Sequence, residues 1–172
     1  MSNRPSRNDF NPYYETYIEK VPEGSIKDVL LEAQQATSEL LASIPEERGS
    51  FKYAEGKWSI KEVIGHINDT ERVMSYRLLR ISRGDSTPLP GFEQDVFVAG
   101  ARFNEYTIEE LAEEYRAIRQ STLKLVSKLS DEALSRRGNA SDFEVTALAL
   151  AYIIAGHELH HLNVLKERYL ID

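Results

Sequence analysis

The sequence predicts an all-α fold: a four-helix bundle with a long crossover between its second and third helices. Three observations predict this fold. Apolar residues recur at helical spacing in four segments of about 20 residues each. Two of these segments open with a capping box, in which Ser or Thr is followed three residues later by Glu. No segment shows a convincing strand pattern, and four long helices bury their apolar faces best as a bundle.

The first part of the chain should supply an N-terminal arm and the first helix. Residues 1–23 are polar and contain prolines that interrupt a helix, while tyrosines and an isoleucine at 13–18 favour an arm that packs on the bundle. The first helix is predicted from Ser25 to about Ile44, because its apolar residues share one face and Pro45 stops the run. The whole chain of 172 residues is expected to form one domain.

The second helix is predicted from Ser59 to about Ile81, with Glu62 completing its capping box. Residues 82–106 then form a long connection, because its prolines and glycines exclude a helix that runs through all of it. A connection of this length is uncommon in a compact domain and often lines a functional site. The crossover is therefore a candidate wall of a site.

The third helix is predicted from Thr107 to about Leu129 and again opens with a capping box, which Glu110 completes. A short helical turn is expected at 130–136. The glycine and asparagine at 138–139 then interrupt the chain before the last helix.

The fourth helix is predicted from near Glu144 to about Tyr169, and it is apolar on nearly all sides from 145 to 154. A helix of this kind is buried. It carries His157 and His161, which lie four residues apart, turned by about 40° and separated by about 6 Å along the axis. Both imidazoles therefore share one face of a buried helix, where a metal ion is one good partner for them.

A third histidine, His66, lies on the second helix between apolar residues. Alone, such a histidine is usually a hydrogen-bonded core side chain. Together with the pair on the fourth helix it predicts a shared site, since three neutral imidazoles suit a divalent transition metal and leave positions open for water or substrate. Zinc and nickel are expected first and iron is compatible, because spacing does not separate them. We therefore predict that His66, His157 and His161 are metal ligands.

Composition narrows the classes of function. The net charge of −7 repels phosphate backbones and anionic lipids, so a small-molecule substrate is expected, with no nucleic acid and no membrane as partner. The lack of cysteine excludes disulfides, thiolate ligands and a cysteine nucleophile, so that any thiol must belong to a substrate. The sequence shows neither a signal peptide nor an apolar run of about 20 residues, and a soluble, cytoplasmic protein is expected.

Polar residues near the histidines are candidates for catalysis and orientation. Asp69 lies one turn beyond His66, where it could orient the imidazole or accept a proton, although a solvated helix face explains it equally well. His160 is turned by about 100° from His161 and is expected beside the site, in contact with substrate or a partner chain. Glu158 is expected to be a surface or interhelical charge.

Further residues of the second helix are candidates for substrate binding. Arg72 and Arg77, with Tyr76, could bind a substrate carboxylate, because a guanidinium makes paired hydrogen bonds to it. Surface ion pairs are the more common role of such arginines. Trp58 is most simply a residue that packs before the Ser59 cap, and it is also a candidate wall of the pocket.

Three segments together resemble a known family: GKWSIKEVIGHINDTER, RGDSTPLPGFEQD and GHELHHLNVLKERY. They are similar to the DinB-like (damage-inducible, YfiT-like) superfamily of metal-binding four-helix proteins, and the likeness covers most of the chain. The resemblance implies a bundle of up-down-down-up order, frequently a homodimer, with metal ligands at His66, His157 and His161. Characterised relatives include S-transferases and isomerases that use low-molecular-weight thiols, and others are labelled metal-dependent hydrolases.

Three functions are compatible with these observations. In the first, which we favour, the protein is a thiol-dependent S-transferase, in which the metal holds a low-molecular-weight thiol as thiolate and the thiolate attacks a small electrophile. In the second, it is a metal-dependent hydrolase that uses metal-bound hydroxide, with Asp69 as the base. In the third, it is a stress-related, non-catalytic helical binding module whose histidines only pack.

Overall fold

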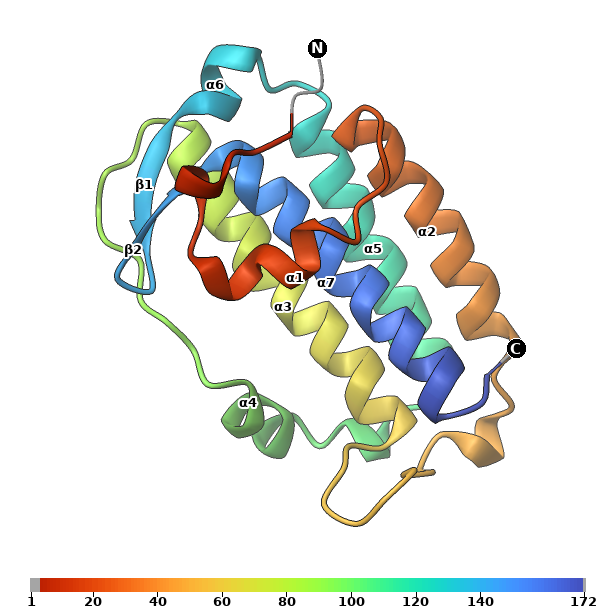
Figure 1. Ribbon diagram of the computed structural model, residues 1–172. Coiled ribbons are helices and arrows are strands. Elements are labelled where there is room, and N and C mark those ends of the chain that lie inside the picture. The colour runs from red at the N-terminus through yellow and green to blue at the C-terminus, as the bar shows by residue number, and fades with distance from the viewer. Residues whose placement is uncertain (1–3, 172) are drawn as a thin grey trace.

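Four long helices form the body of the protein. In a computed structural model, which describes residues 4–171, they are α2 (Ile26–Ser43), α3 (Ile60–Ser82), α5 (Ile108–Val126) and α7 (Ala147–Arg168). α3 packs beside α7 and α5, and α2 packs beside the same two helices, so that α2 and α3 lie diagonally opposite (Figure 1). α3 and α5 run in one direction, and α2 and α7 run in the other. The predicted up-down-down-up four-helix bundle is confirmed.

Both predicted capping boxes are present, at the starts of α3 and α5. The Ser59 hydroxyl accepts a hydrogen bond from the Glu62 amide at 3.1 Å, and the Glu62 carboxylate accepts one from the Ser59 amide at 2.6 Å. Thr107 and Glu110 make the same exchange at 3.1 and 2.7 Å. Each box satisfies amides that lack an intrahelical partner and fixes the residue at which the helix begins. The start of α3 matters because it sets the turn that carries His66.

The crossover from α3 to α5 runs along the length of the bundle (Figure 1). The prediction that no helix runs through all of it is confirmed. A shorter helix that the sequence did not predict, α4 (Gln94–Ala101), forms within it, followed by a 3-10 turn at Phe103–Glu105. Gly65 of α3 receives the Phe103 ring, with which any side chain at this glycine would collide. This contact holds the crossover against the helix that carries His66.

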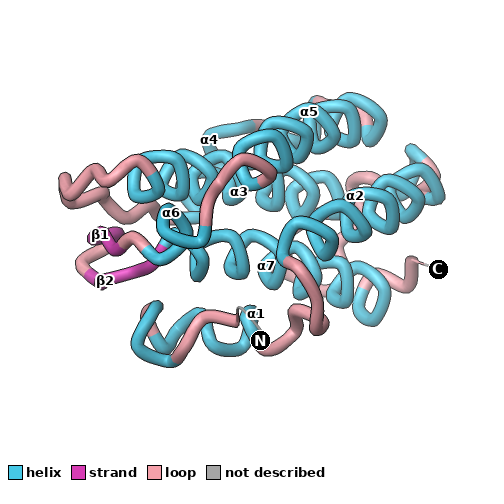
Figure 2. Tube along the Cα trace, turned by 90° about the horizontal axis from the view of Figure 1, so that it is seen from above, coloured by secondary structure: helices cyan, strands magenta, loops and turns pink. Residues whose placement is uncertain are grey.

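The N-terminal arm lies across the bundle on the side of α7 (Figures 1 and 2). It consists of two 3-10 turns, Arg7–Asp9 and Pro12–Tyr14, followed by the short helix α1 (Glu15–Ile18). α1 packs on α7, and Ile18 is buried in the same apolar cluster as the first half of that helix. Residues 1–3 of the predicted arm lie outside the described residues.

Between α5 and α7 the chain forms a small β-hairpin that the sequence analysis missed. β1 (Arg137–Ala140) pairs antiparallel with β2 (Phe143–Thr146). Ser141 and Asp142 both have positive φ, 54° and 65°, as the two-residue type I′ hairpin turn requires. The predicted all-α fold class holds, with this small hairpin as an addition. The sequence shows no convincing strand pattern there, because strands of four residues are too short to show an alternation.

The hairpin also corrects the predicted start of the fourth helix. Glu144 belongs to β2, and α7 begins at Ala147. The Thr146 hydroxyl accepts a hydrogen bond from the Ala149 amide at 3.1 Å and caps the helix. The apolar run crosses this boundary without a break, so its periodicity does not locate the cap. The short helix α6 (Asp131–Ser135) agrees with the helical turn predicted there.

A buried polar layer divides the bundle core at mid-height. One apolar cluster contains Leu30 and Leu78, and the other contains Leu41 and Ile64. All four long helices place buried polar side chains between the two clusters: Thr37 of α2, His66 and Glu71 of α3, Arg119 of α5, and His157 and Glu158 of α7. Burying a polar group without a partner in an apolar core costs free energy of folding, so these side chains need partners. The layer is therefore a candidate functional site.

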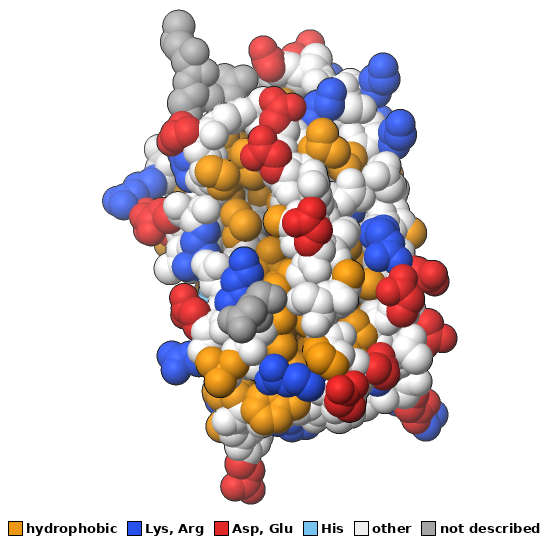
Figure 3. All heavy atoms as spheres, turned by 90° about the vertical axis from the view of Figure 1, so that its right-hand side faces the viewer, with side chains coloured by type: hydrophobic (Ala, Val, Ile, Leu, Met, Phe, Trp, Pro, Cys, Tyr) orange, Lys and Arg blue, Asp and Glu red, His pale blue; other side chains and the backbone are white. Residues whose placement is uncertain are grey.

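The surface carries both signs of charge. On one long face, acidic and basic side chains border a band of exposed hydrophobic side chains (Figure 3). Within residues 4–171, no helix has the length and the apolar content that crossing a lipid bilayer requires.

Candidate metal centre

α3 and α7 bring three imidazole rings together at mid-height of the bundle. Nε2 of His66 lies 2.9 Å from Nε2 of His157. The ring centroid of His161, one turn further along α7, lies 4.8 Å from that of His66 and 4.5 Å from that of His157. One potential ligand atom from each ring lies within 4.8 Å of the other two. The three histidines that the sequence singled out therefore converge.

Burial keeps all three imidazoles uncharged near neutral pH. His66 and His157 are only 3% and 7% exposed. Burial, and after it the charge of His160, lowers the pKa of His66 to about 4. Burial, together with neighbouring histidines, lowers the pKa of His161 to about 3 and that of His157 well below its usual value. Neutral imidazoles have a nitrogen lone pair to offer, as a metal ligand must.

One nitrogen of this cluster lacks a partner within the protein. Nδ1 of His161 is buried and makes no hydrogen bond to any residue in the described part of the chain. A buried polar atom without a partner is unfavourable, and native structures rarely contain one without a reason. A cation between the three rings would take the place of the 2.9 Å contact between the Nε2 atoms of His66 and His157. The donor set therefore fits a divalent transition metal.

Aromatic rings enclose the histidines on two sides. A Cβ atom at Gly156 would lie 2.1 Å from the carbonyl oxygen of Tyr17, so only a glycine lets α1 rest this closely on α7. The approach places the Tyr17 ring 5.5 Å from the His157 ring. The Trp58 ring, just before α3, lies 4.7 Å from the ring of His66. The arm and the start of α3 thus both shield the cluster from water.

A buried ion network lies beside the histidines in the bundle core. The Arg119 guanidinium donates to both carboxylate oxygens of Glu71, at 2.9 and 2.8 Å, and to Glu158 at 2.7 Å. Glu158 also accepts hydrogen bonds from the hydroxyls of Thr37, at 2.7 Å, and Tyr115. Glu158 is thus an interhelical charge, as one of the two predicted alternatives stated. Because it directly follows a histidine of the cluster, the network fixes the rotation of α7 at the site.

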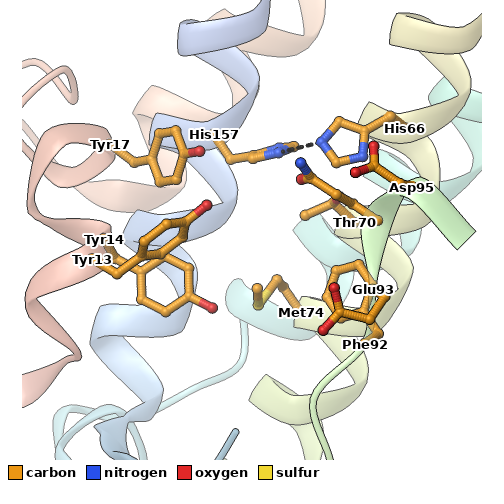
Figure 4. Close-up of a pocket in the computed structure, with 11 residues that line it drawn as sticks. Tyr13, Tyr14, Tyr17, His66, Thr70, Met74, Phe92, Glu93, Asp95 and His157 are labelled. Carbon is orange, nitrogen blue, oxygen red and sulfur yellow. Dashed lines mark hydrogen bonds between the residues drawn. The ribbon is translucent and has the colours of Figure 1, made fainter. Parts of the chain in front are cut away.

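The first of two cavities at the cluster lies between the arm and the crossover (Figure 4). Its volume is about 300 Å³. His66 and His157 line its inner end, and Thr70 and Met74 of α3 line it further along the helix. The three tyrosines of the arm face Phe92 and two acidic residues of the crossover across the cavity.

The second cavity, also of about 300 Å³, lies toward the start of α3 and the end of α7. Trp58, His160 and His161 line it, together with Lys57. Asp95 of α4 lines both cavities. Two residues predicted to bind substrate, Trp58 and His160, therefore face a cavity at the histidine cluster. Their contact with substrate stays a prediction.

Asp69, the predicted catalytic residue, lines neither cavity. Its carboxylate lies 3.5 Å from the Arg72 guanidinium. Burial raises the pKa of Asp69, Arg72 opposes this rise, and Glu114 adds to it. The carboxylates that line the first cavity are instead Glu93 and Asp95, which come from the crossover. These two residues are the better-placed candidates for a proton acceptor.

The three residues predicted to bind a carboxylate share a different groove. Arg72, Tyr76 and Arg77 line a depression of about 350 Å³ between α3 and the crossover. Arg72 pairs with Glu114 at 2.7 Å, and the buried Arg77 donates to the Pro90 carbonyl oxygen at 2.6 Å. The structure places none of the three against the cavities that reach the histidines.

Four polar residues of the first cavity had no assigned role in the sequence: Thr70, Glu93, Gln94 and Asp95. Thr70 was within reach of sequence reasoning, because it lies four residues after His66 on the same helix face. Its hydroxyl is buried and has no hydrogen-bond partner among the described residues. Glu93 and Asp95 belong to a crossover that carries no motif, and only its length suggested that it lines a site.

The fold and the cluster together define a class of protein: an up-down-down-up helical bundle with three converging imidazoles on its second and fourth long helices. Comparison with known families identifies the group within this class. A family model described as the DinB superfamily matches residues 30–165, and the chain belongs to this superfamily. The matched part contains all three histidines.

Individual relatives agree with this assignment. A protein of Oceanobacillus iheyensis named "putative metal-dependent hydrolase" is 27% identical over 153 residues, which cover 86% of this chain and 87% of the relative. YfiT of Bacillus subtilis, described as "a probable metal-dependent hydrolase with an unusual four-helix bundle topology", superposes with a TM-score of 0.71 at 14% identity, over 99% of this chain and 95% of that one. A mycothiol-dependent maleylpyruvate isomerase gives 0.66 at 12% identity, over 89% and 62%. At 14% and 12% sequence identity, these two solved structures show only that this chain has the same fold as they do.

Proposed function

We propose that the protein is a metal-dependent enzyme that transfers a low-molecular-weight thiol to a small electrophile at the three-histidine site. The observation that carries the proposal is the pair of cavities, each of about 300 Å³, that meet at the histidines. A transfer reaction joins two molecules, and each needs a place beside the same reacting centre. A relative named for metal dependence and a structural neighbour named for mycothiol dependence support a metal and a thiol in this fold.

His66, His157 and His161 would hold the metal. A divalent ion bound there would supply Lewis acidity, which makes a thiol or a water molecule a better nucleophile at neutral pH. Because the three imidazoles are already neutral at pH 7, no proton has to leave the protein before they can bind a cation. Zinc and nickel both accept three nitrogen ligands, and iron is compatible.

The cavity walls would bind the substrates and move one proton. The Met74 side chain and the Phe92 ring would pack against the apolar part of a substrate in the first cavity. The Asp95 carboxylate, which lines both cavities, would accept the thiol proton as the carbon–sulfur bond forms. With an epoxide as electrophile, one carbon–oxygen bond breaks and the proton ends on the resulting alcohol oxygen.

Hydrolysis is the second candidate function, and a specific observation favours it. A hydrolase needs a base near its nucleophilic water, and the first cavity offers the Glu93 and Asp95 carboxylates. The two relatives named as metal-dependent hydrolases point the same way. In this reaction one cavity would hold the substrate and the other would hold solvent.

The test is a panel of thiols with metal reconstitution. Protein without a histidine tag is stripped with chelator, reloaded with zinc or nickel, and incubated with monochlorobimane and each thiol. We expect conjugate only when metal and thiol are both present, and none with His161→Ala. Ester or amide cleavage without conjugation would select the hydrolase. A wild-type protein that binds no more metal than His66→Ala would select the non-catalytic module.

A further inference from the structure

The charge of the first cavity is opposite to that expected of a carboxylate-binding site. We propose that this cavity binds the ammonium-bearing end of a small molecule. The tyrosines of the arm and the carboxylates of Glu93 and Asp95 recognise the ammonium group. The Thr70 hydroxyl makes a hydrogen bond to a polar group of the same molecule near the histidines. The inference rests on the proposed function in one respect: it takes the ligand of this cavity to be a substrate.

The charged groups around the cavity favour a cation. Apart from His66 and His157, which would hold the metal, Glu93 and Asp95 are the only described residues lining it that carry a charged side chain at neutral pH. A bound divalent ion would add positive charge at the histidine end, so the attraction of the two carboxylates for a cation is strongest in the metal-free protein. Burial raises the pKa of Tyr14, a residue of the cavity wall, and the Arg77 guanidinium opposes this rise, but Arg77 does not itself line the cavity. Both residues are exposed, and two carboxylates at one side of an open cavity attract a positive charge and repel a carboxylate.

The aromatic wall is suited to the same charge. The rings of Tyr13 and Tyr14 lie 5.2 Å apart with an angle of 83° between their planes, and those of Tyr13 and Tyr17 lie 6.2 Å apart at 76°. Rings set nearly at right angles present faces and edges in several directions, as in an aromatic cage. Figure 4 shows these tyrosines across the cavity from Glu93 and Asp95. A cation between them would meet the tyrosines, whose hydroxyl groups point toward the cavity in Figure 4, on one side and carboxylates on the other.

An independent observation points to a ligand in the same cavity. Thr70 is 3% exposed, and its Oγ1 has no hydrogen-bond partner in the described part of the chain. The residue lines the cavity one turn beyond His66. A buried hydroxyl without a partner is unfavourable, and a polar group of a ligand would satisfy it. The ligand thus combines a cationic end with a hydrogen-bonding group, as a small aminothiol does.

Choline and its neutral isostere 3,3-dimethylbutan-1-ol test the charge preference, because they share shape and hydroxyl. NMR titration measures both, in zinc-loaded and in chelated protein. We expect choline to bind about 2- to 30-fold more tightly, the range of cation–π interactions. The preference should become clearly smaller in the Glu93→Gln, Asp95→Asn double variant, which removes the carboxylates and leaves the aromatic wall in place. It should persist in Asp131→Asn, Glu132→Gln, which removes the same two charges from the exposed helix α6.

Thr70→Val tests the hydroxyl separately. It should weaken both probes by a similar factor of about 2 to 10, the loss of one hydrogen bond, and leave their ratio unchanged. Equal binding of choline and its isostere, or a preference that is undiminished in the Glu93→Gln, Asp95→Asn variant, would overturn the inference. Binding needs no turnover, so a choline preference in an enzyme without transferase or hydrolase activity would refute the proposed function alone.

Discussion

At the scale of the residue, the site depends on three imidazoles that the fold holds neutral and close together. Helix geometry made this much predictable, because residues four apart must share a face and a histidine on another buried helix must meet some partner. The residues that surround the histidines were harder to predict from the sequence. Asp95 reaches the cluster from a segment without periodicity, and Tyr17 reaches it only because position 156 is a glycine.

Loss of one histidine should remove the stabilisation that metal provides. A ligand that binds only the folded state adds about 4 kcal/mol when its free concentration is a thousand times its Kd. We expect chelator to lower the melting temperature of the wild type and to leave that of His161→Ala unchanged. Asn163→Ala, at an exposed position on the same helix, should respond as the wild type does. Equal losses with and without chelator would assign the histidines to packing instead.

The metal-free protein should lose stability as the pH falls below 6.5. The pKa of His66 is about 4 in the folded state and near 6.5 in the unfolded chain, so the unfolded chain binds more protons between these values. The contribution of His66, about 3 kcal/mol, is complete above pH 6.5 and lost progressively down to about pH 4. Urea unfolding at pH 7, 5.5 and 4 with excess chelator measures it. His66→Gln should flatten the profile, and an equally steep profile in that variant would contradict the assignment.

At the scale of the element, the arm and α7 form a unit that the sequence did not reveal. Helices α2, α3, α5 and α7 were predictable because each has a long apolar periodicity, and capping boxes located two of their starts. The hairpin was missed because its strands are too short, and α4 because Pro88 and Pro90 marked the crossover as a break. The docking of α1 depends on backbone atoms of Tyr17, which no pattern of side chains encodes.

Gly156→Ala should displace α1 from α7. The added methyl group would collide with the backbone of Tyr17, and overpacking of this kind costs about 1–3 kcal/mol. We expect a lower urea midpoint and faster hydrogen exchange at residues 13–18. The control is Gly100→Ala on α4, where a methyl group meets open space and helix propensity favours alanine. Wild-type stability and exchange in Gly156→Ala would show that the arm tolerates the shift.

At the scale of the whole molecule, one polar layer joins all four long helices. Burial alone would lower the pKa of Arg119, but Glu158 and Glu71 keep it well above its usual value, so the guanidinium stays charged inside the core. Sequence reasoning did not predict this network, since Arg119 and Glu71 lie 48 positions apart on helices whose rotation is set by packing. The expected homodimer and cytoplasmic location stay predictions.

Arg119→Met should destabilise the whole bundle. It leaves Glu71 and Glu158 buried without their cation, and breaking a buried pair in this way costs about 3–5 kcal/mol. The control is Arg116→Met on the same helix, which breaks a partly exposed pair with Glu109 and should cost about 0–1 kcal/mol. Denaturant unfolding compares the two. Adding Glu71→Gln should restore part of the loss, and a loss below about 1 kcal/mol for Arg119→Met would refute the argument.

The separation of the histidines along the chain has a consequence for biosynthesis. His66 and His157 lie 91 positions apart, and the last two imidazoles belong to the final long helix. A nascent chain still held by the ribosome at that helix therefore displays a single imidazole of the three. A cation can therefore gain all three ligands only after α7 has been translated.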